Sequence, residues 1–141
     1  MRTRFGDIDF DLVDGWLELE DERVPTLVRD NGAGAFQITT ATYQSGILPQ
    51  VELADLEELL SGLRGSRGLG EPTAVTHESS PERAILSAEF SDLEYWTRVW
   101  YLTDGRSVSL LTYTCAMVDF AVGQKEAGEV DRMVRSARFP V

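Results

Sequence analysis

Residues 94–115, EYWTRVWYLTDGRSVSLLTYTC, constrain the fold more than any other part of the chain. Two runs rich in aromatic and β-branched residues flank Asp104-Gly105. An Asp-Gly pair between two such runs is a strong signal for a β-hairpin with a two-residue turn. The sequence therefore predicts a tight hairpin, in which counting outwards from the turn places Trp100 opposite Ser109.

This pairing divides the hairpin into two apolar faces, because side chains alternate along a strand. One face carries Tyr101, Val99, Val108 and Leu110, and the other carries Trp96, Arg98, Trp100, Leu111 and Tyr113. Either a helix covers the second face as part of the core, or that face is open to a partner. Trp, Tyr and Arg are the residues enriched in binding hot spots. We therefore take Trp96, Arg98, Trp100 and Tyr113 as candidate partner-binding residues. On this interpretation Trp100→Ala costs about 2 kcal/mol of binding and leaves the fold intact.

Other segments supply the rest of the fold. Alternating or extended apolar patterns predict strands near residues 8–12, 17–20, 25–28, 35–41, 73–76 and 83–90. Leucines at steps of three and four predict a helix over about 51–64, and a second helix is predicted over about 124–136. In this second helix, Glu129 with Arg132 and Asp131 with Arg135 have the spacing of helical ion pairs. We expect one α+β domain spanning residues 1–141, with a mainly antiparallel, twisted sheet packed against two helices.

Charge narrows the choice of partner. The chain has 24 acidic and 13 basic residues, a formal net charge of −11 and an isoelectric point near 4.4. Such a surface repels phosphate backbones and anionic lipids, so we expect neither nucleic acid nor membrane as a partner. Many acids lie near the N-terminus, and we take Asp7, Asp9, Asp11, Glu18 and Glu20 as an acidic column that steers a basic partner.

Sequence features also give an expected location. The first residues lack the apolar stretch and small-residue cleavage site of a signal peptide, and no segment is apolar for long enough to span a membrane. The single cysteine, Cys115, has no partner within the chain for a disulfide. We expect a cytoplasmic protein.

The residues needed for catalysis or metal binding are few. His77 is the only histidine and lies in a polar stretch, while Cys115 ends an apolar strand and is expected to be a buried, inert thiol. Asp7, Asp9, Asp11 and Glu18 have the spacing of a calcium loop, but Leu12 stands where that loop requires glycine. We expect no enzyme, no metal site and no cofactor.

Two segments resemble a known group of proteins. The sequence FDLVDGW, residues 10–16, is similar to the F-x-L-P-x-G-W start of PsbP-like α/β proteins, a group that includes the DcrB-like proteins. The tail VRSARF, residues 134–139, is similar to their closing helix-to-strand segment. The resemblance implies an α/β sandwich. It does not imply one function, because this fold includes photosystem subunits, lipoproteins, secretion chaperones and toxin-immunity proteins.

Three functional classes are compatible with these features. The first is a bacterial immunity protein that binds and neutralises a toxin, with its negative charge steering it onto a basic target. The second is a chaperone or adaptor for a secreted effector, which requires an exposed apolar groove. The third is a small-ligand-binding domain, which requires a concave pocket.

Overall fold

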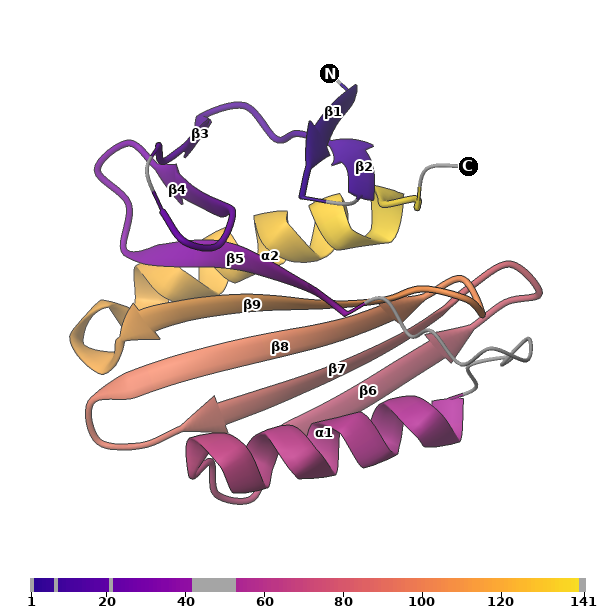
Figure 1. The fold of residues 1–141 in the computed structure, drawn as a ribbon. Coiled ribbons are helices and arrows are strands. Elements are labelled where there is room, and N and C mark those ends of the chain that lie inside the picture. Colours follow the sequence, from indigo (N-terminus) through magenta and orange to yellow (C-terminus); the bar gives the residue numbers. More distant parts are fainter. Residues whose placement is uncertain (1, 7, 21, 42–52, 140–141) are drawn as a thin grey trace.

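An antiparallel sheet of seven strands forms the centre of the protein (Figure 1). The computed structural model describes residues 2–6, 8–20, 22–41 and 53–139. In spatial order the strands are β3 (Trp16–Glu18), β4 (Thr26–Arg29), β5 (Gly34–Ala41), β9 (Val108–Ala116), β8 (Tyr95–Thr103), β7 (Ala84–Ser91) and β6 (Ala74–Ser79). All neighbouring strands pair antiparallel, which confirms the predicted sheet type.

Two helices cover opposite faces of this sheet, as Figure 1 shows. Helix α1 (Leu53–Arg67) packs on β7, and helix α2 (Phe120–Ser136) packs on β9 and β8. A short 3-10 helix, η1 (Met117–Asp119), connects β9 to α2. Both predicted helices and the single α+β domain are confirmed, although α1 continues to Arg67 and α2 already begins at Phe120. Positions 51 and 52 of the first predicted helix lie outside the described residues.

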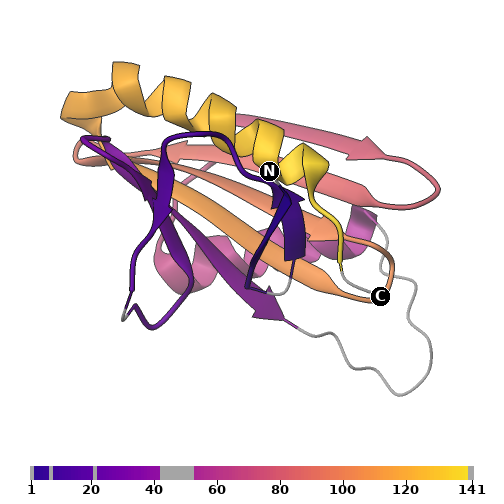
Figure 2. The same cartoon turned by 90° about the horizontal axis from the view of Figure 1, so that it is seen from above.

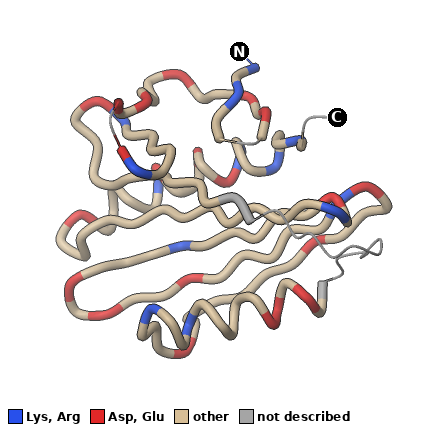
Figure 3. Tube along the Cα trace, in the orientation of Figure 1, with Lys and Arg blue, Asp and Glu red and all other residues tan. Residues whose placement is uncertain are grey.

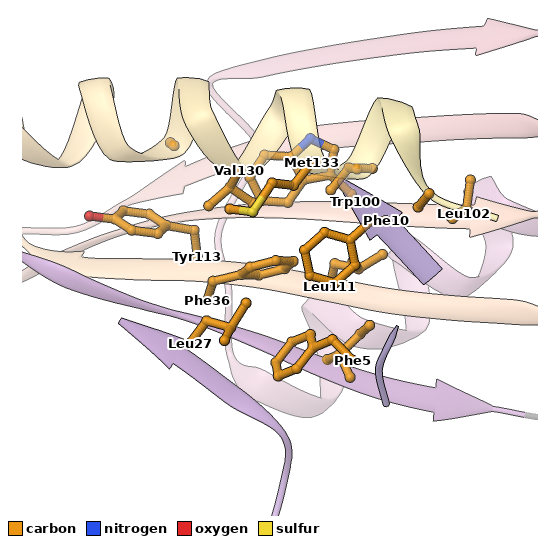
Figure 4. Close-up of a cluster of buried hydrophobic side chains, with 14 of the residues drawn as sticks. Phe5, Phe10, Leu27, Phe36, Trp100, Leu102, Leu111, Tyr113, Val130 and Met133 are labelled. Atoms are coloured by element: carbon orange, nitrogen blue, oxygen red, sulfur yellow. The ribbon is translucent and has the colours of Figure 1, made fainter. Parts of the chain in front are cut away.

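Each face of the sheet has its own hydrophobic core. On the α1 side, Leu56, Leu60 and Leu63 pack with side chains of β7, β8 and β9 such as Val99 and Tyr101. The larger core, on the α2 side, joins both tryptophans of β8 to α2 and to the N-terminal strands (Figure 4). The two faces predicted for the β8–β9 hairpin are therefore confirmed, and both are covered.

A separate N-terminal hairpin packs beside the C-terminal half of α2 (Figures 1 and 2). It consists of β1 (Arg2–Phe5) and β2 (Ile8–Asp11). Phe5, Ile8 and Phe10 are buried in the α2-side core, and Asp9 exchanges two backbone hydrogen bonds of 2.8 and 2.7 Å with Arg138. Strand β1 was not predicted, because a run of four residues with one large apolar side chain has no readable period.

The turn between β8 and β9 is longer than the sequence predicted. Thr103 pairs with Val108, so the loop contains four residues rather than the two of Asp104-Gly105. Asp104 Oδ1 accepts the backbone N–H groups of Arg106 and Ser107 at 2.9 and 2.8 Å, and these bonds close the loop. The predicted register is wrong by two residues: Trp100 faces Leu111, not Ser109. Each side chain nevertheless keeps its predicted face, because the side-chain period of a strand is two.

Candidate functional site

The aromatic residues predicted to bind a partner belong to the core. Trp96, Trp100 and Tyr113 are buried beneath α2, and Trp100 is completely shielded from solvent. The Trp100 indole N–H donates to Asp131 of α2 at 3.0 Å, and the Tyr113 hydroxyl donates to Glu126 of α2 at 2.7 Å. The expectation that these residues form an open surface is wrong, because α2 uses them as its own docking site.

Arg98, the fourth residue of that predicted surface, is also engaged within the chain. Its Nε donates to Ser87 Oγ at 2.9 Å, and its Nη2 lies 3.2 Å from an oxygen of Asp131. The guanidinium carbon stands 4.8 Å from the centre of the Trp100 ring, which adds a cation–π contact. Arg98 thus links two strands to α2 rather than facing a partner.

The acidic column predicted at the N-terminus is not one continuous surface. Asp7 lies outside the described residues, while Asp9 and Asp11 pair across the small hairpin with Arg4 and Arg2 at 2.8 and 3.3 Å. The hydrogen bond from Arg4 holds the pKa of Asp9 below its ordinary value. The prediction of an unneutralised column is therefore wrong on β2, because it overlooked the basic strand beside it.

The remaining acids of that column lie on a different element. Glu18 ends β3, at the edge of the large sheet, and Glu20 follows it; both side chains are exposed. The small hairpin that holds Asp9 and Asp11 is a separate sheet. The structure therefore does not place the predicted acids side by side in one row.

The structure also shows the surroundings of Cys115 and His77, the two other residues considered for catalysis. Cys115 is buried, as predicted, and this burial raises the pKa of its thiol. His77 is exposed on the edge strand β6. Within the described ranges, no three His, Cys, Asp or Glu side chains lie close enough together to hold a metal ion.

A different surface emerges at one end of the sheet. Leu93, in the turn between β7 and β8, is 100% exposed, and Val118 in η1 is 92% exposed. Tyr95 and Val122 are about half exposed. We call these four residues, Leu93, Tyr95, Val118 and Val122, the end patch. The backbone connects its two segments, because Tyr95 pairs with Ala116 and the Met117 N–H donates to the Glu94 carbonyl at 2.8 Å.

Acidic side chains border the end patch. Asp92, Glu94 and Asp119 are all exposed and lie within one or two positions of its members, at the end of the sheet where α2 begins (Figures 1 and 3). Asp92 Oδ1 accepts the N–H groups of Glu94 and Tyr95 at 2.7 and 2.8 Å. The hydrogen bonds from Tyr95 and Glu94 lower the pKa of Asp92, because they stabilise the charged form of its carboxylate.

Sequence reasoning missed the end patch for a physical reason. Leu93 and Val118 are single apolar residues within short polar connections, and isolated apolar residues of this kind are common. Only the pairing of β8 with β9 brings positions 93–95 and 118–122 to the same end of the molecule. No local period in the sequence reports that proximity.

Beside the end patch lies an open hollow of about 580 Å³, which we call the end hollow. Tyr95 belongs to both features. The other lining residues come from the β4–β5 hairpin and the end of β9: Val28, Arg29, Asn31, Gly32, Ala33, Gly34, Ala35, Thr114, Cys115 and Ala116. The end of the sheet thus combines an exposed apolar patch, an acidic border and a concave surface.

Comparisons with known proteins give the fold. Comparison of the sequence with known protein families and with curated proteins gave no match. The structure is similar to the solution structure of cyanobacterial PsbP (CyanoP) from Synechocystis, with a TM-score of 0.63 and 12% sequence identity. The similarity covers 99% of this chain and 92% of that one. The chain has a PsbP-like fold.

At 12% identity, this likeness concerns architecture alone. It confirms the α/β sandwich that the sequence resemblance implied. Neither α1 nor α2, the two α-helices of the described residues, combines the length and the apolar character that crossing a membrane requires.

Proposed function

We propose that this PsbP-like domain is a non-enzymatic binding protein whose partner is a basic protein, and that its role is that of a bacterial immunity protein neutralising a toxin. The observation that carries the proposal is the end patch with its acidic border. Four partly or fully exposed apolar side chains supply area that a partner can desolvate. The acids around them supply complementarity to a positively charged surface.

The charge also argues against a second copy of the chain as the occupant. In a symmetric dimer built on the end patch, the carboxylates of Asp92, Glu94 and Asp119 would approach their own equivalents. Each chain also carries a formal net charge of −11, so two copies repel one another at longer range. A basic partner is attracted both by the acidic border of the end patch and by the net negative charge of the chain.

The charged and the apolar residues of such an interface have different roles. Exposed carboxylates mainly set the association rate and its salt dependence, whereas desolvated apolar and aromatic side chains supply the energy that holds the complex. Leu93, Tyr95 and Val118 are the expected anchors. On this proposal, the end patch and its acidic border take the two roles that the sequence assigned to the aromatic face and the acidic column.

The experiment compares two variants in an affinity capture followed by a measured titration. Protein captured by the chain from its native source is identified, purified and titrated against the Leu93→Ser/Val118→Ser double variant. Val75→Ser is the matched control, because Val75 is a half-exposed apolar residue on the edge strand β6. We expect the double variant to weaken binding at least about tenfold, since an interface anchor contributes 1–2 kcal/mol or more. The control should bind like wild type.

Salt supplies a second readout. Association should slow steeply between low and physiological ionic strength, as it does for oppositely charged partners. Equal weakening by Val75→Ser and by the double variant, or binding that ignores both substitutions, would show that the partner docks elsewhere. A partner that is acidic and insensitive to salt would contradict the proposal as well.

A further inference from the structure

The end hollow lies on the α1-bearing face of the sheet, where α1 itself does not reach. Strand pairing aligns two cross-strand rows there. Val28, Ala35 and Thr114 form the first row, and Ala116 and Tyr95 form the second. Helix α1 packs on β7, and its core residues meet β7, β8 and the start of β9. The exposed side chain of Thr114 and the half-buried ones of Val28 and Ala35 mark the uncovered part of the face.

The lining offers apolar contact more than hydrogen bonds. Its polar groups are largely committed to α2: the Ala33 and Gly34 N–H groups donate to Glu126, at 2.9 Å and 3.2 Å. Arg29 donates to both carboxylate oxygens of Glu129 at 2.7 and 2.6 Å. Arg29 Nη1 and these two amides are thus engaged within the chain. The hollow therefore favours an apolar group over a carboxylate or a phosphate.

Tyr95 gives the hollow an aromatic wall. Its side chain is half exposed, and its backbone is fixed by the hydrogen bond from its N–H to Asp92 Oδ1 at 2.8 Å. A half-exposed ring of this kind stacks on another ring or on a cation. The volume of about 580 Å³ lies in the range of ordinary ligand sites and is ample for one large side chain.

The acidic residues near the hollow favour a basic segment of the partner as the one that presents this side chain. Glu94 neighbours Tyr95 in sequence, and Asp92 and Asp119 border the same end of the sheet. Together with the formal net charge of −11, these acids favour a cationic group near the rim. The only lysine of the chain, Lys125, lies at an exposed position of α2.

From these observations we infer that the end hollow is a receptor for an aromatic side chain presented by a basic segment of the partner protein. This inference rests on the proposed function and adds to it the chemistry of the contact. The aromatic ring packs on Ala35, Ala116 and Tyr95, while the neighbouring cations meet Asp92 and Glu94. The contact adjoins the end patch, because Tyr95 belongs to both.

Small probes test the receptor without the partner. The 15N-labelled chain is titrated with tryptamine, a cationic indole, and separately with indole-3-propionate, its anionic counterpart. We expect tryptamine to shift the backbone signals of residues 33–35, 95, 114 and 116 and to leave those of the edge strand at 74–79 unchanged. The anion should bind about two- to fivefold more weakly, as should tryptamine to Tyr95→Ala, given the size of an exposed cation–π contact.

Each outcome decides a separate claim. If tryptamine shifts other regions or none, or if both probes bind equally, the receptor inference is wrong. Should Tyr95→Ala bind tryptamine like wild type, the aromatic wall is wrong. Either result leaves the proposed function standing, because that function is judged by the Leu93→Ser/Val118→Ser titration with the captured protein. If tryptamine binds in the hollow but the Leu93→Ser/Val118→Ser variant binds the captured protein like wild type, the receptor inference stands and the proposed function is wrong.

Discussion

Gly123 of α2 lies directly against the sulfur of Cys115 on β9, so that a methyl group on Gly123 would overlap the Sγ atom. The Cys115 side chain points to the α2-side core, and Gly123 is buried against it. The absence of a side chain at 123 is therefore what lets the first half of α2 approach the sheet. Glycine here serves packing, at a position where helix propensity alone favours alanine.

Gly123→Ala should accordingly destabilise the domain by about 1–3 kcal/mol, because overpacking outweighs the gain in helix propensity. Gly128 of the same helix is the matched control, since an added methyl group there meets nothing within 4 Å. Gly128→Ala should stabilise by about 0.5–1 kcal/mol. Urea unfolding measures both. Opposite signs for the two variants support the close approach, and two stabilising substitutions would refute it.

Asp131→Asn should destabilise the domain in a pH-dependent way. Burial raises the pKa of Asp131, but hydrogen bonds from Arg135 and Trp100 and the charge of Arg98 outweigh burial and hold it below its ordinary value of 3.8. A lowered folded-state pKa adds stability above the unfolded value, and this stability disappears as pH falls through the folded value. The deficit of the variant should therefore be about 1–2 kcal/mol at pH 7 and shrink below about pH 3.8.

Unfolding curves at pH 7, 5 and 3 check this expectation. The exposed Glu58→Gln variant on α1 removes the same charge from a different helix and serves as control. A deficit of Asp131→Asn that stayed constant from pH 7 to pH 3 would mean that the carboxylate charge contributes nothing.

Trp100→Ala should act on folding rather than on binding. The side chain is fully buried and donates to Asp131 Oδ1, so its removal leaves a large cavity and takes one of two hydrogen-bond donors from that oxygen, the other being Arg98. We expect a loss of about 3–5 kcal/mol. Leu93→Ala, at a fully exposed position, should change stability by less than about 0.5 kcal/mol. Chemical denaturation followed by circular dichroism distinguishes the two, and an intact fold in Trp100→Ala would restore the surface interpretation of the aromatic face.

Arg29 and Arg132 offer a test of which arginine Glu129 uses. The spacing on α2 predicts Arg132, but the structure pairs Glu129 with Arg29 of β4 at 2.6 Å and adds a 3.1 Å hydrogen bond from the Trp16 indole. Arg29→Met should therefore cost about 1–2 kcal/mol, whereas Arg132→Met should be near neutral. A double-mutant cycle with Glu129→Gln gives the coupling for each pair. Coupling to Arg132 alone would contradict the observed geometry.

The features that could be predicted from the sequence are those that depend on neighbouring residues. The faces of the hairpin and the two helices were predictable because periods of two and 3.6 are written in consecutive residues. The Asp131–Arg135 pair at 2.8 Å followed from spacing in the same way. Coverage of Trp100 by α2, neutralisation of Asp9 by Arg4 and the assembly of the end patch were not predictable. Each depends on contacts between elements that only the tertiary fold brings together.

The loop at residues 104–107 has a consequence for how the hairpin can change in length. The register of β8 against β9 differs by two residues from that of a hairpin with a two-residue turn. A shift of two changes every cross-strand pair but leaves each side chain on the same face of the sheet. Insertions or deletions of residues in pairs at this loop should thus be tolerated, with both tryptophans still directed at α2. A slip of β8 by one residue would instead present Trp96 and Trp100 to the leucines of α1.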